Sequence, residues 1–227
     1  MAQSVLVIAD SGTGKSTSIR TLDPKETFII NIANKPLPFK GWKSKYTQIT
    51  KDNPKGNLTS AATAPGIIKA MRHVNDKMGH IKTIVVDDWQ YMSSFEYFDR
   101  ANEKGYEKFT QIAANLAQVA KLPKDLRDDL TIIFLTHSED STDINGNRKI
   151  KAKTVGKMID NTLTLEGLFS IVLFGKVNKN DDGELEYGFE TQNNGENTCK
   201  SPMGMFEDKF IKNDLQFVTS CIEEYNK

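Results

Sequence analysis

A glycine-rich segment near the start of the chain has the residue types that bind phosphate. Residues 9–17 read Ala-Asp-Ser-Gly-Thr-Gly-Lys-Ser-Thr and follow the apolar run Val5–Ile8. They match the pattern G-x-x-x-x-G-K-[ST] except at the first position, where Ala9 replaces glycine. Glycines are needed because backbone N–H groups must approach phosphate oxygens closely, and the N-terminus of a following helix favours that charge. The pattern predicts ATP bound by Ser11, Gly12, Thr13, Gly14, Lys15, Ser16 and Thr17.

Two residues of this segment have individual expected roles. Lys15 would reach the β- and γ-phosphates as a mobile point charge and assist catalysis there. The Ser16 hydroxyl would take one position around a Mg²⁺ ion. A Gly/Ser turn that only caps a helix would require neither this lysine nor the apolar strand before it.

Hydrolysis also needs an acid at the end of a neighbouring strand, and two aspartates supply it. Asp87 and Asp88 follow Thr83–Val86, whose β-branched and apolar residues are typical of a buried strand. We expect Asp87 to hold Mg²⁺ through a water molecule and Asp88 to orient or deprotonate the attacking water. The alternative is an acidic strand end, or the cap of a following helix.

A histidine ends the next predicted strand. His137 follows Thr131–Thr136, which we expect to lie beside the strand that ends at Asp87. At that place its ring would contact the γ-phosphate or the attacking water, and the alternative is a histidine that faces solvent. His137 is therefore the third predicted catalytic residue, with Lys15 and Asp88.

The order of the predicted elements indicates an α/β fold. Apolar runs of strand length alternate with helical stretches, which is typical of a mostly parallel sheet covered by helices. Beyond Val177, turn signals on both sides of an alternating stretch predict a C-terminal β-hairpin extension. The predicted strands are Val5–Ala9, Thr27–Ile32, Thr83–Val86, Thr131–Thr136, Ser170–Val177 and Leu185–Thr191, and the predicted helices are Ser16–Leu22, Ala64–Met78, Tyr106–Lys121 and Asp214–Tyr225.

Length and composition limit the protein's class. The 227 residues suit a single domain over residues 1–227, and 30 basic against 30 acidic residues leave no net charge to attract a polyanion to the whole chain. Cys199 and Cys221 lack metal-ligand spacing, so we expect reduced thiols. No apolar stretch approaches the ~20 residues that span a bilayer, so we expect a soluble, cytoplasmic protein without membrane contact.

Basic residues nevertheless gather locally in two stretches. Residues 35–46 mix lysines with aromatic residues that could stack on bases. Residues 147–157 contain no acid and follow a Ser/Asp/Asn/Gly-rich segment, so we expect an exposed loop that could track a phosphodiester backbone. Its candidate DNA-binding residues are Arg148, Lys149, Lys151, Lys153 and Lys157. A solvated or packed surface is the alternative for both stretches.

Four segments in this order resemble the bacteriophage RecA-like ATPases, which are linked to single-strand annealing and homologous recombination. They are Ser11–Leu22, Lys35–Trp42, Val85–Tyr91 and Cys199–Phe206. The resemblance implies a RecA-like P-loop core, binding to single-stranded DNA, assembly into a ring or filament, and a phage or host single-strand-binding protein as a partner. For a phage-encoded chain it also implies the host cytoplasm.

The resemblance transfers unevenly to single residues. Lys15, Ser16 and Asp87 match the family's nucleotide and metal positions, and residues 138–157 fall where related recombinases carry a DNA-contacting loop. Lys200 lies near the region from which such enzymes send a cation into the neighbouring subunit's site. RecA-like proteins place a catalytic glutamate at the end of the second strand, where this chain has Asn31 and Asn34. The family comparison therefore implies slow hydrolysis with Asp88 as the water-orienting group.

Three other functions are open at this point. A small-molecule or nucleotide kinase usually closes an arginine-rich lid over the phosphates, but the five arginines here form no cluster. An AAA+ remodeller or helicase loader needs a helical lid after the fifth strand, where hairpin signals stand instead. A non-hydrolysing ATP-dependent binding protein fits the missing glutamate.

Overall fold

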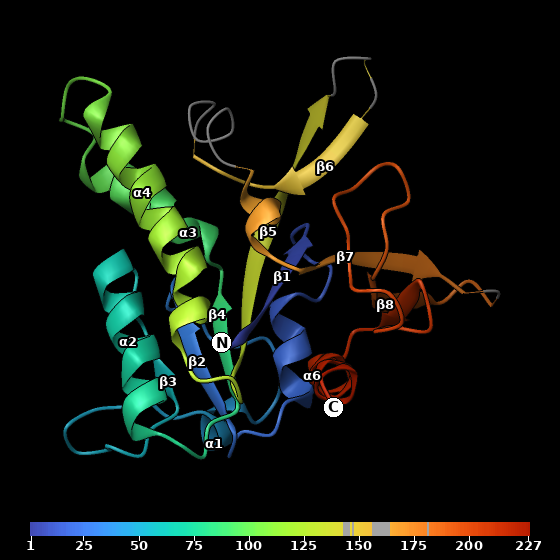
Figure 1. The fold of residues 1–227 in the computed structure, drawn as a ribbon, viewed down its shortest axis with the longest axis horizontal. Coiled ribbons are helices and arrows are strands. Elements are labelled where there is room, and N and C mark those ends of the chain that lie inside the picture. The colour runs from blue at the N-terminus through green and yellow to red at the C-terminus, as the bar shows by residue number, and fades with distance from the viewer. Residues whose placement is uncertain (143–145, 147, 156–163, 181) are drawn as a thin grey trace.

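The fold is built on one large β-sheet, whose strands run in the order β3-β2-β4-β5-β1-β7-β8-β9, with β6 paired to β5 off this path (Figure 1). The computed structural model describes residues 1–142, 146, 148–155, 164–180 and 182–227. The strands are β1 Gln3–Ala9, β2 Thr27–Asn31, β3 Leu58–Thr59, β4 Thr83–Asp87, β5 Thr131–Thr142, β6 Arg148–Ala152, β7 Ile171–Lys179, β8 Leu185–Glu190 and β9 Phe210–Lys212.

Parallel pairing brings the ends of the central strands to one edge of the sheet. From β3 through β2, β4, β5 and β1 to β7, each strand is parallel to the next one in the sheet. The pairing places Asn31 opposite Asp87 and Ala9 opposite His137. Residues 56 and 128 positions apart in the sequence therefore meet where ligands bind in open parallel sheets.

Alternating apolar residues give the sheet two cores. Ile84 and Val86 face the core formed with helices α2 Ala64–Lys77, α3 Gln90–Asp99 and α4 Glu107–Lys121, whereas Val85 faces the opposite core. That second core contains the 3₁₀ helix η1 Ser16–Thr21, helix α6 Leu215–Tyr225 and the segment around the short helix α1 Trp42–Lys45. Two further 3₁₀ turns, η2 Leu122–Asp125 and η3 Leu165–Leu168, complete the described helices.

The predicted α/β architecture is confirmed, with differences at several elements. Each predicted strand forms, and β7 and β8 make the antiparallel C-terminal hairpin. The helix expected over Ser16–Leu22 is the shorter 3₁₀ helix η1. Sequence patterns missed α3, which carries aromatic residues without a clear apolar stripe. Its N-cap residue, Trp89, forms no capping hydrogen bond through its side chain. They also missed β3 and β9, which contain only two and three residues.

The expectation of a loop after Thr136 was wrong for the residues that the structure describes. Strand β5 continues to Thr142 and pairs antiparallel with β6, from Ser138 opposite Ala152 to Thr142 opposite Arg148. Alternation of Lys149, Ile150 and Lys151 fits this pairing, because successive side chains of a strand point to opposite faces. The polar composition of the segment concealed that pattern.

Aromatic packing and free thiols complete the core. The rings of Trp89, Phe134 and Phe169 pack against one another, and the Trp89 centroid lies 4.6 Å from that of Phe134 and 5.9 Å from that of Phe169. Cys199 and Cys221 are free, and burial raises the pKa of the Cys199 thiol. In the part of the chain that the structure describes, no helix is both long and apolar enough to cross a membrane.

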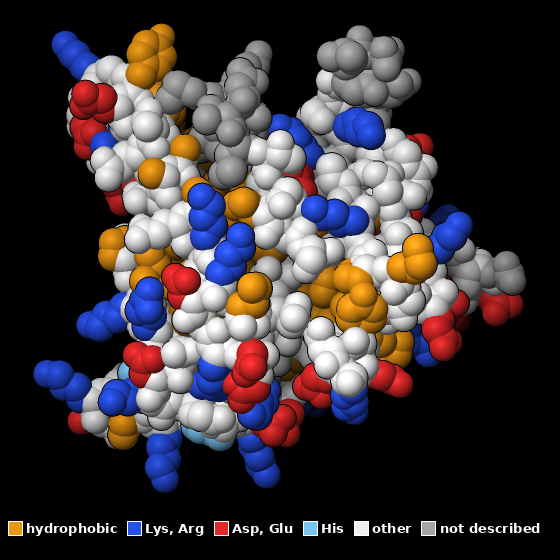
Figure 2. Space-filling view, viewed as in Figure 1, with side chains coloured by type: hydrophobic (Ala, Val, Ile, Leu, Met, Phe, Trp, Pro, Cys, Tyr) orange, Lys and Arg blue, Asp and Glu red, His pale blue; other side chains and the backbone are white. Residues whose placement is uncertain are grey.

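The surface in Figure 2 agrees with the balanced composition. Among the side chains coloured there, lysine and arginine are scattered between acidic groups over this face instead of forming one basic patch. A polyanion that binds this face would therefore contact a few lysine or arginine side chains and not one extended basic patch.

Candidate nucleotide-binding site

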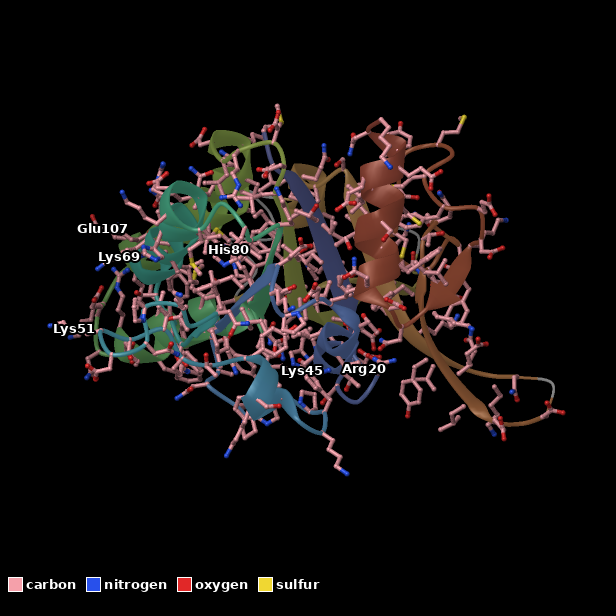
Figure 3. All side chains as sticks on the ribbon, turned by 90° about the horizontal axis from the view of Figure 1, so that it is seen from below. Arg20, Lys45, Lys51, Lys69, His80 and Glu107 are labelled. Atoms are coloured by element: carbon pink, nitrogen blue, oxygen red, sulfur yellow. The ribbon has the colours of Figure 1, made fainter. Side chains whose placement is uncertain are left out.

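A cavity of about 590 Å³ opens beyond the ends of β1 and β4, beside His137 of β5. The 3₁₀ helix η1, which carries Arg20, lies at its border (Figure 3). The cavity is lined by Ser11, Gly12, Gly14, Lys15, Ser16, Thr17, Arg20, Lys35, Pro38, Asp88, Tyr91, His137, Tyr187 and Asn213. Six of the seven residues predicted to bind ATP are in this lining. Thr13 instead donates a hydrogen bond to the Asp10 carbonyl at 2.8 Å, inside the loop.

The loop between β1 and η1 depends on glycine conformations. Gly12 and Gly14 have φ angles of 83° and 88°, in the left-handed region that favours glycine. A Cβ atom at Gly14 would also lie 3.1 Å from the Asn213 amide nitrogen. The glycines therefore allow both the turn and the close approach of the C-terminal segment.

Ala9, the one departure from the phosphate-binding pattern, is accommodated by a glycine on the adjacent strand. Gly175 of β7 lies directly opposite Ala9 of β1. A Cβ atom built at Gly175 would lie only 2.7 Å from the Ala9 Cβ atom. The space for the alanine methyl group at the start of the loop therefore comes from Gly175.

The variant Gly175→Ala tests this packing. The added methyl group should reduce the free energy of unfolding by about 1–3 kcal/mol, because it overpacks a buried contact and forces β1 and β7 apart. The double variant Ala9→Gly with Gly175→Ala removes the opposing methyl group and should be more stable than Gly175→Ala. Urea denaturation measures both. A single variant as stable as the wild type would contradict the packing argument.

Lys15, Ser16 and Asp87 come together as the sequence predicts. The Ser16 hydroxyl donates a hydrogen bond to Asp87 Oδ1 at 2.8 Å. Lys15 is only 6% exposed, and burial lowers the pKa of its ammonium group, against the opposing charges of Asp88 and Asp87. Burial and the neighbouring Asp88 charge raise the pKa of Asp87 to about 6. Asp87 and Asp88 therefore place two buried carboxyl groups beside the phosphate-binding loop.

Asp88 is held by two groups instead of facing the cavity alone. Its Oδ2 atom lies 2.5 Å from Lys35 Nζ, and its Oδ1 atom lies 3.5 Å from His137 Nε2. Burial opposes ionisation of Asp88, but the contacts with His137 and Lys35 together lower its pKa to about 2. The Asp88 backbone has φ 60°, a left-handed conformation that is uncommon outside glycine and turns the chain from β4 towards α3.

His137 lies in the cavity lining, beside Asp88. Gln90, which no sequence pattern marks, holds Thr136 and His137 in place. Gln90 Oε1 accepts hydrogen bonds from the Thr136 hydroxyl at 3.3 Å and from the His137 backbone N–H at 3.2 Å. The Gln90 side chain is thus a buried positioning group between α3 and the end of β5.

The asparagines at the expected glutamate position have structural contacts. The Asn31 side chain donates to the Lys35 carbonyl at 2.6 Å and accepts from the Lys35 N–H at 3.3 Å. Asn34 accepts a hydrogen bond from the Ser60 hydroxyl at 2.7 Å. Asn31 therefore closes a tight turn whose last residue, Lys35, reaches the site.

A further contact comes from the C-terminal segment. The Asn213 side chain donates to the Gly14 carbonyl at 3.1 Å and accepts from Arg20 at 2.7 Å. Asn213 is only 4% exposed and its N–H donates to the Tyr187 carbonyl at 3.0 Å. Asn213 connects the phosphate-binding loop to β8 and α6. Because Asn213 and Gly14 are 199 positions apart, no local sequence pattern indicates this contact.

The candidate DNA-binding residues whose side chains the structure describes, Lys149, Lys151 and Lys153, are not in the lining of this cavity. Lys149 and Lys151 stand on β6, where Lys151 forms an ion pair of 3.1 Å with Glu139 of β5. Lys153 is exposed and extends the hairpin. Lys157 and the side chain of Arg148 lie outside the residues that the structure describes.

Two other predicted features are also placed. The Lys200 backbone pairs with Val172 of β7, and Lys200 does not line the cavity of its own chain. In residues 35–46, Tyr46 is buried and Phe39 and Trp42 pack against the second core. The interpretation of Tyr46 as a base-stacking residue was therefore wrong, and the packed alternative is correct for it.

Comparison with known proteins gives a family for this chain. Residues 1–203 match the AAA domain family, which is most of the chain. No curated protein matches it. The match includes the phosphate-binding loop, Asp87, Asp88 and His137, and leaves Asn213 and α6 outside. The chain therefore belongs to the AAA domain family, whose members are P-loop, nucleotide-binding ATPases.

Proposed function

We propose that this protein is a Mg²⁺-dependent ATPase of phage recombination, which uses ATP to control oligomerisation and binding to single-stranded DNA. One observation carries the enzymatic part: the hydrogen bond of 2.8 Å between Ser16 and Asp87, beside the buried Lys15. A hydroxyl and a carboxylate at this distance form half of an oxygen-rich metal site next to a phosphate-binding loop.

The residues present fit Mg²⁺. Ser16 and Asp87 offer the hard oxygen atoms that this ion prefers. Burial and the neighbouring Asp88 charge raise the pKa of Asp87, and a bound cation would favour its ionised form. When bound, Mg²⁺ would neutralise charge on the phosphates.

The other site residues have matching roles in hydrolysis. Lys15 binds the phosphates from the loop, and the backbone N–H groups of the loop contact their oxygens. Asp88 accepts a hydrogen bond from the attacking water, and His137 orients Asp88 from β5. Because Lys35 already neutralises Asp88 and Asn31 replaces the expected glutamate, we expect slow turnover.

The DNA-binding part is supported by the position of the basic hairpin. The Lys153 N–H donates to the carbonyl of His137 at 2.8 Å, so the basic strand continues directly from the cavity wall. Through this hydrogen bond, a movement of His137 on nucleotide binding would also move the basic segment at Lys153. Lys153 is exposed and Lys149 of β6 is half-buried, and both could reach phosphodiester oxygens.

The variant Lys149→Ala, Lys151→Ala, Lys153→Ala tests this assignment. Losing up to three phosphate contacts should lower the slope of log K against log salt by about 2 for single-stranded DNA, at roughly 0.7 per contact. Fluorescence anisotropy over a salt series measures the slope. The charge-matched control replaces the exposed Lys69, Lys77 and Lys121 with alanine and should keep the wild-type slope. An unchanged slope in the β6 variant would remove this hairpin from DNA binding.

A kinase is the main alternative. Arg20 is the one arginine in the described lining of the cavity, and it is already bonded to Asn213. Water is therefore a better supported acceptor than a small molecule held by an arginine-rich lid. Incubation with radiolabelled ATP and a panel of nucleosides and nucleoside monophosphates distinguishes the two, because transfer to any of them would support a kinase.

The proposed oligomer gives Lys200 a role. Its position away from its own cavity suits a cation that reaches the site of a neighbouring subunit in a ring or filament. A phage or host single-strand-binding protein would supply the DNA on which such an assembly forms.

A further inference from the structure

Lys35 is a second lysine at the cavity, and it does not belong to the phosphate-binding loop. Its ammonium group lies 2.5 Å from Asp88 Oδ2 and 5.5 Å from the centre of the Tyr91 ring. The Lys35 side chain is 58% exposed, whereas that of Asp88 is 2% exposed. The ion pair therefore joins a buried, fixed carboxylate to a lysine that is free to move towards solvent and the cavity.

The backbone of Lys35 is fixed although its side chain is exposed. Both of its backbone polar groups bond to the side chain of Asn31, at 2.6 and 3.3 Å. Asn31 is itself buried and lies opposite Asp87 in the sheet. This anchoring keeps the base of the lysine at the cavity edge, so that only its flexible side chain can move.

Two groups of side chains border the loop in this cavity. In the first group, Asn213 accepts a hydrogen bond from Arg20 and donates to the carbonyl of Gly14, and its backbone N–H donates to the carbonyl of Tyr187. Lys35, Asp88 and His137 form the other group, together with Tyr91. The second group contains the charged residues beside Asp87 and Lys15, where the most anionic part of a bound nucleotide would be stabilised.

We propose that Lys35 contacts the terminal phosphate of ATP, leaving its ion pair with Asp88 to do so. This inference rests on the proposed ATPase function. A phosphate oxygen carries more charge than a carboxylate oxygen and competes well for an exposed ammonium group. Once Lys35 moves, Asp88 is free to accept a hydrogen bond from water, so the lysine links the presence of the third phosphate to the catalytic carboxylate. ADP lacks that phosphate and leaves the Lys35–Asp88 pair intact.

Nucleotide affinity of Lys35→Met tests the contact. The probes are ADP and the β,γ-imido analogue of ATP, both with Mg²⁺, measured by titration calorimetry. Lys35→Met should weaken the triphosphate analogue by about 10-fold to 100-fold, the value of a charged hydrogen bond, and change ADP affinity by less than about 2-fold. Lys35→Arg should retain most of the preference, and Lys40→Met, an exposed lysine nearby, should change neither affinity.

A double-mutant cycle with Asp88→Asn tests the exchange itself. Asp88→Asn removes the competing carboxylate and should strengthen binding of the imido analogue in the wild-type background. In the Lys35→Met background most of that gain should disappear, because no lysine remains to be released. Purely additive effects, or equal losses for ADP and the analogue in Lys35→Met, would overturn the inference while leaving the ATPase proposal intact. A wild-type protein that binds neither nucleotide would overturn both.

Discussion

Replacing Lys15 with alanine should lower the ATP turnover of this protein by about 10²-fold to 10³-fold, or about 3–4 kcal/mol of transition-state stabilisation. The lysine is 6% exposed and lies beside Asp87 and Asp88. Its positive charge therefore acts in a site that is largely shielded from water. Phosphate release at saturating ATP, with nucleotide affinity measured separately, determines the loss. Lys69→Ala on α2 is the matched control and should behave as wild type.

The Lys15→Ala protein should also remain folded. Burial lowers the pKa of this ammonium group, so its removal costs little stability in the absence of nucleotide. Circular dichroism and urea denaturation check this point. A folded Lys15→Ala protein that hydrolyses ATP at the wild-type rate would refute the assignment of the phosphate-binding loop.

The variant Asp87→Asn should have opposite effects on activity and stability. Turnover should fall by about 10²-fold to 10³-fold, because a neutral amide is a poor ligand for Mg²⁺ beside Ser16. The free energy of unfolding without nucleotide should rise by roughly 1–3 kcal/mol at pH 8, because a buried charge next to Asp88 is removed. The amide oxygen can still accept the hydrogen bond of Ser16. Asp76→Asn, at an exposed position of α2, is the control.

The raised pKa of Asp87 determines whether the free energy of unfolding rises or falls with pH. The pKa of Asp87 is raised from 3.8 to about 6 in the folded protein, so the native state binds this proton more tightly than the unfolded state. The stability of the wild type should therefore fall as pH rises from about 4 to about 6, and the advantage of Asp87→Asn should appear over that range. An Asn variant less stable than wild type at pH 8 would contradict the account of this buried charge.

The sequence was sufficient for the parts of the site that short motifs encode. The loop from Ser11 to Thr17 contains its own glycines, lysine and hydroxyl, and the apolar run before Asp87 marks a buried strand end. Parallel pairing of β1 and β4 with β5 then brings these two ends to one edge of the sheet, which is why Ser16 and Asp87 could be predicted to share one Mg²⁺ site.

Residues that act through tertiary contacts could not be found in this way. Asn213, Gln90 and Lys35 reach the site because β9, α3 and the turn after β2 pack there, and no spacing in the sequence records that packing. The same limit applies to Gly175, whose importance depends on the Ala9 methyl group in the adjacent strand. A glycine opposite a departure from the motif is informative only when the strand order is known.

The Lys35–Asp88 pair would also give a physical reason for the slow hydrolysis that we propose. Asp88, the proposed water-orienting carboxylate, forms an ion pair of 2.5 Å with Lys35, and Asn31 is hydrogen-bonded to the backbone of Lys35. A site in this state would be kept from unproductive turnover until a triphosphate attracts Lys35. The rate of ATP hydrolysis would then depend mainly on the bound nucleotide and on ligands that rearrange the β5–β6 hairpin.

The most direct measurement of the central claim is phosphate release from ATP by the purified wild-type protein, in Mg²⁺ and in excess EDTA. We expect slow phosphate release in Mg²⁺ that exceeds the rate in EDTA by at least about tenfold, because Ser16 and Asp87 need the ion to complete the site. Equal rates with Mg²⁺ and with EDTA, or ATP that is neither bound nor hydrolysed, would contradict it.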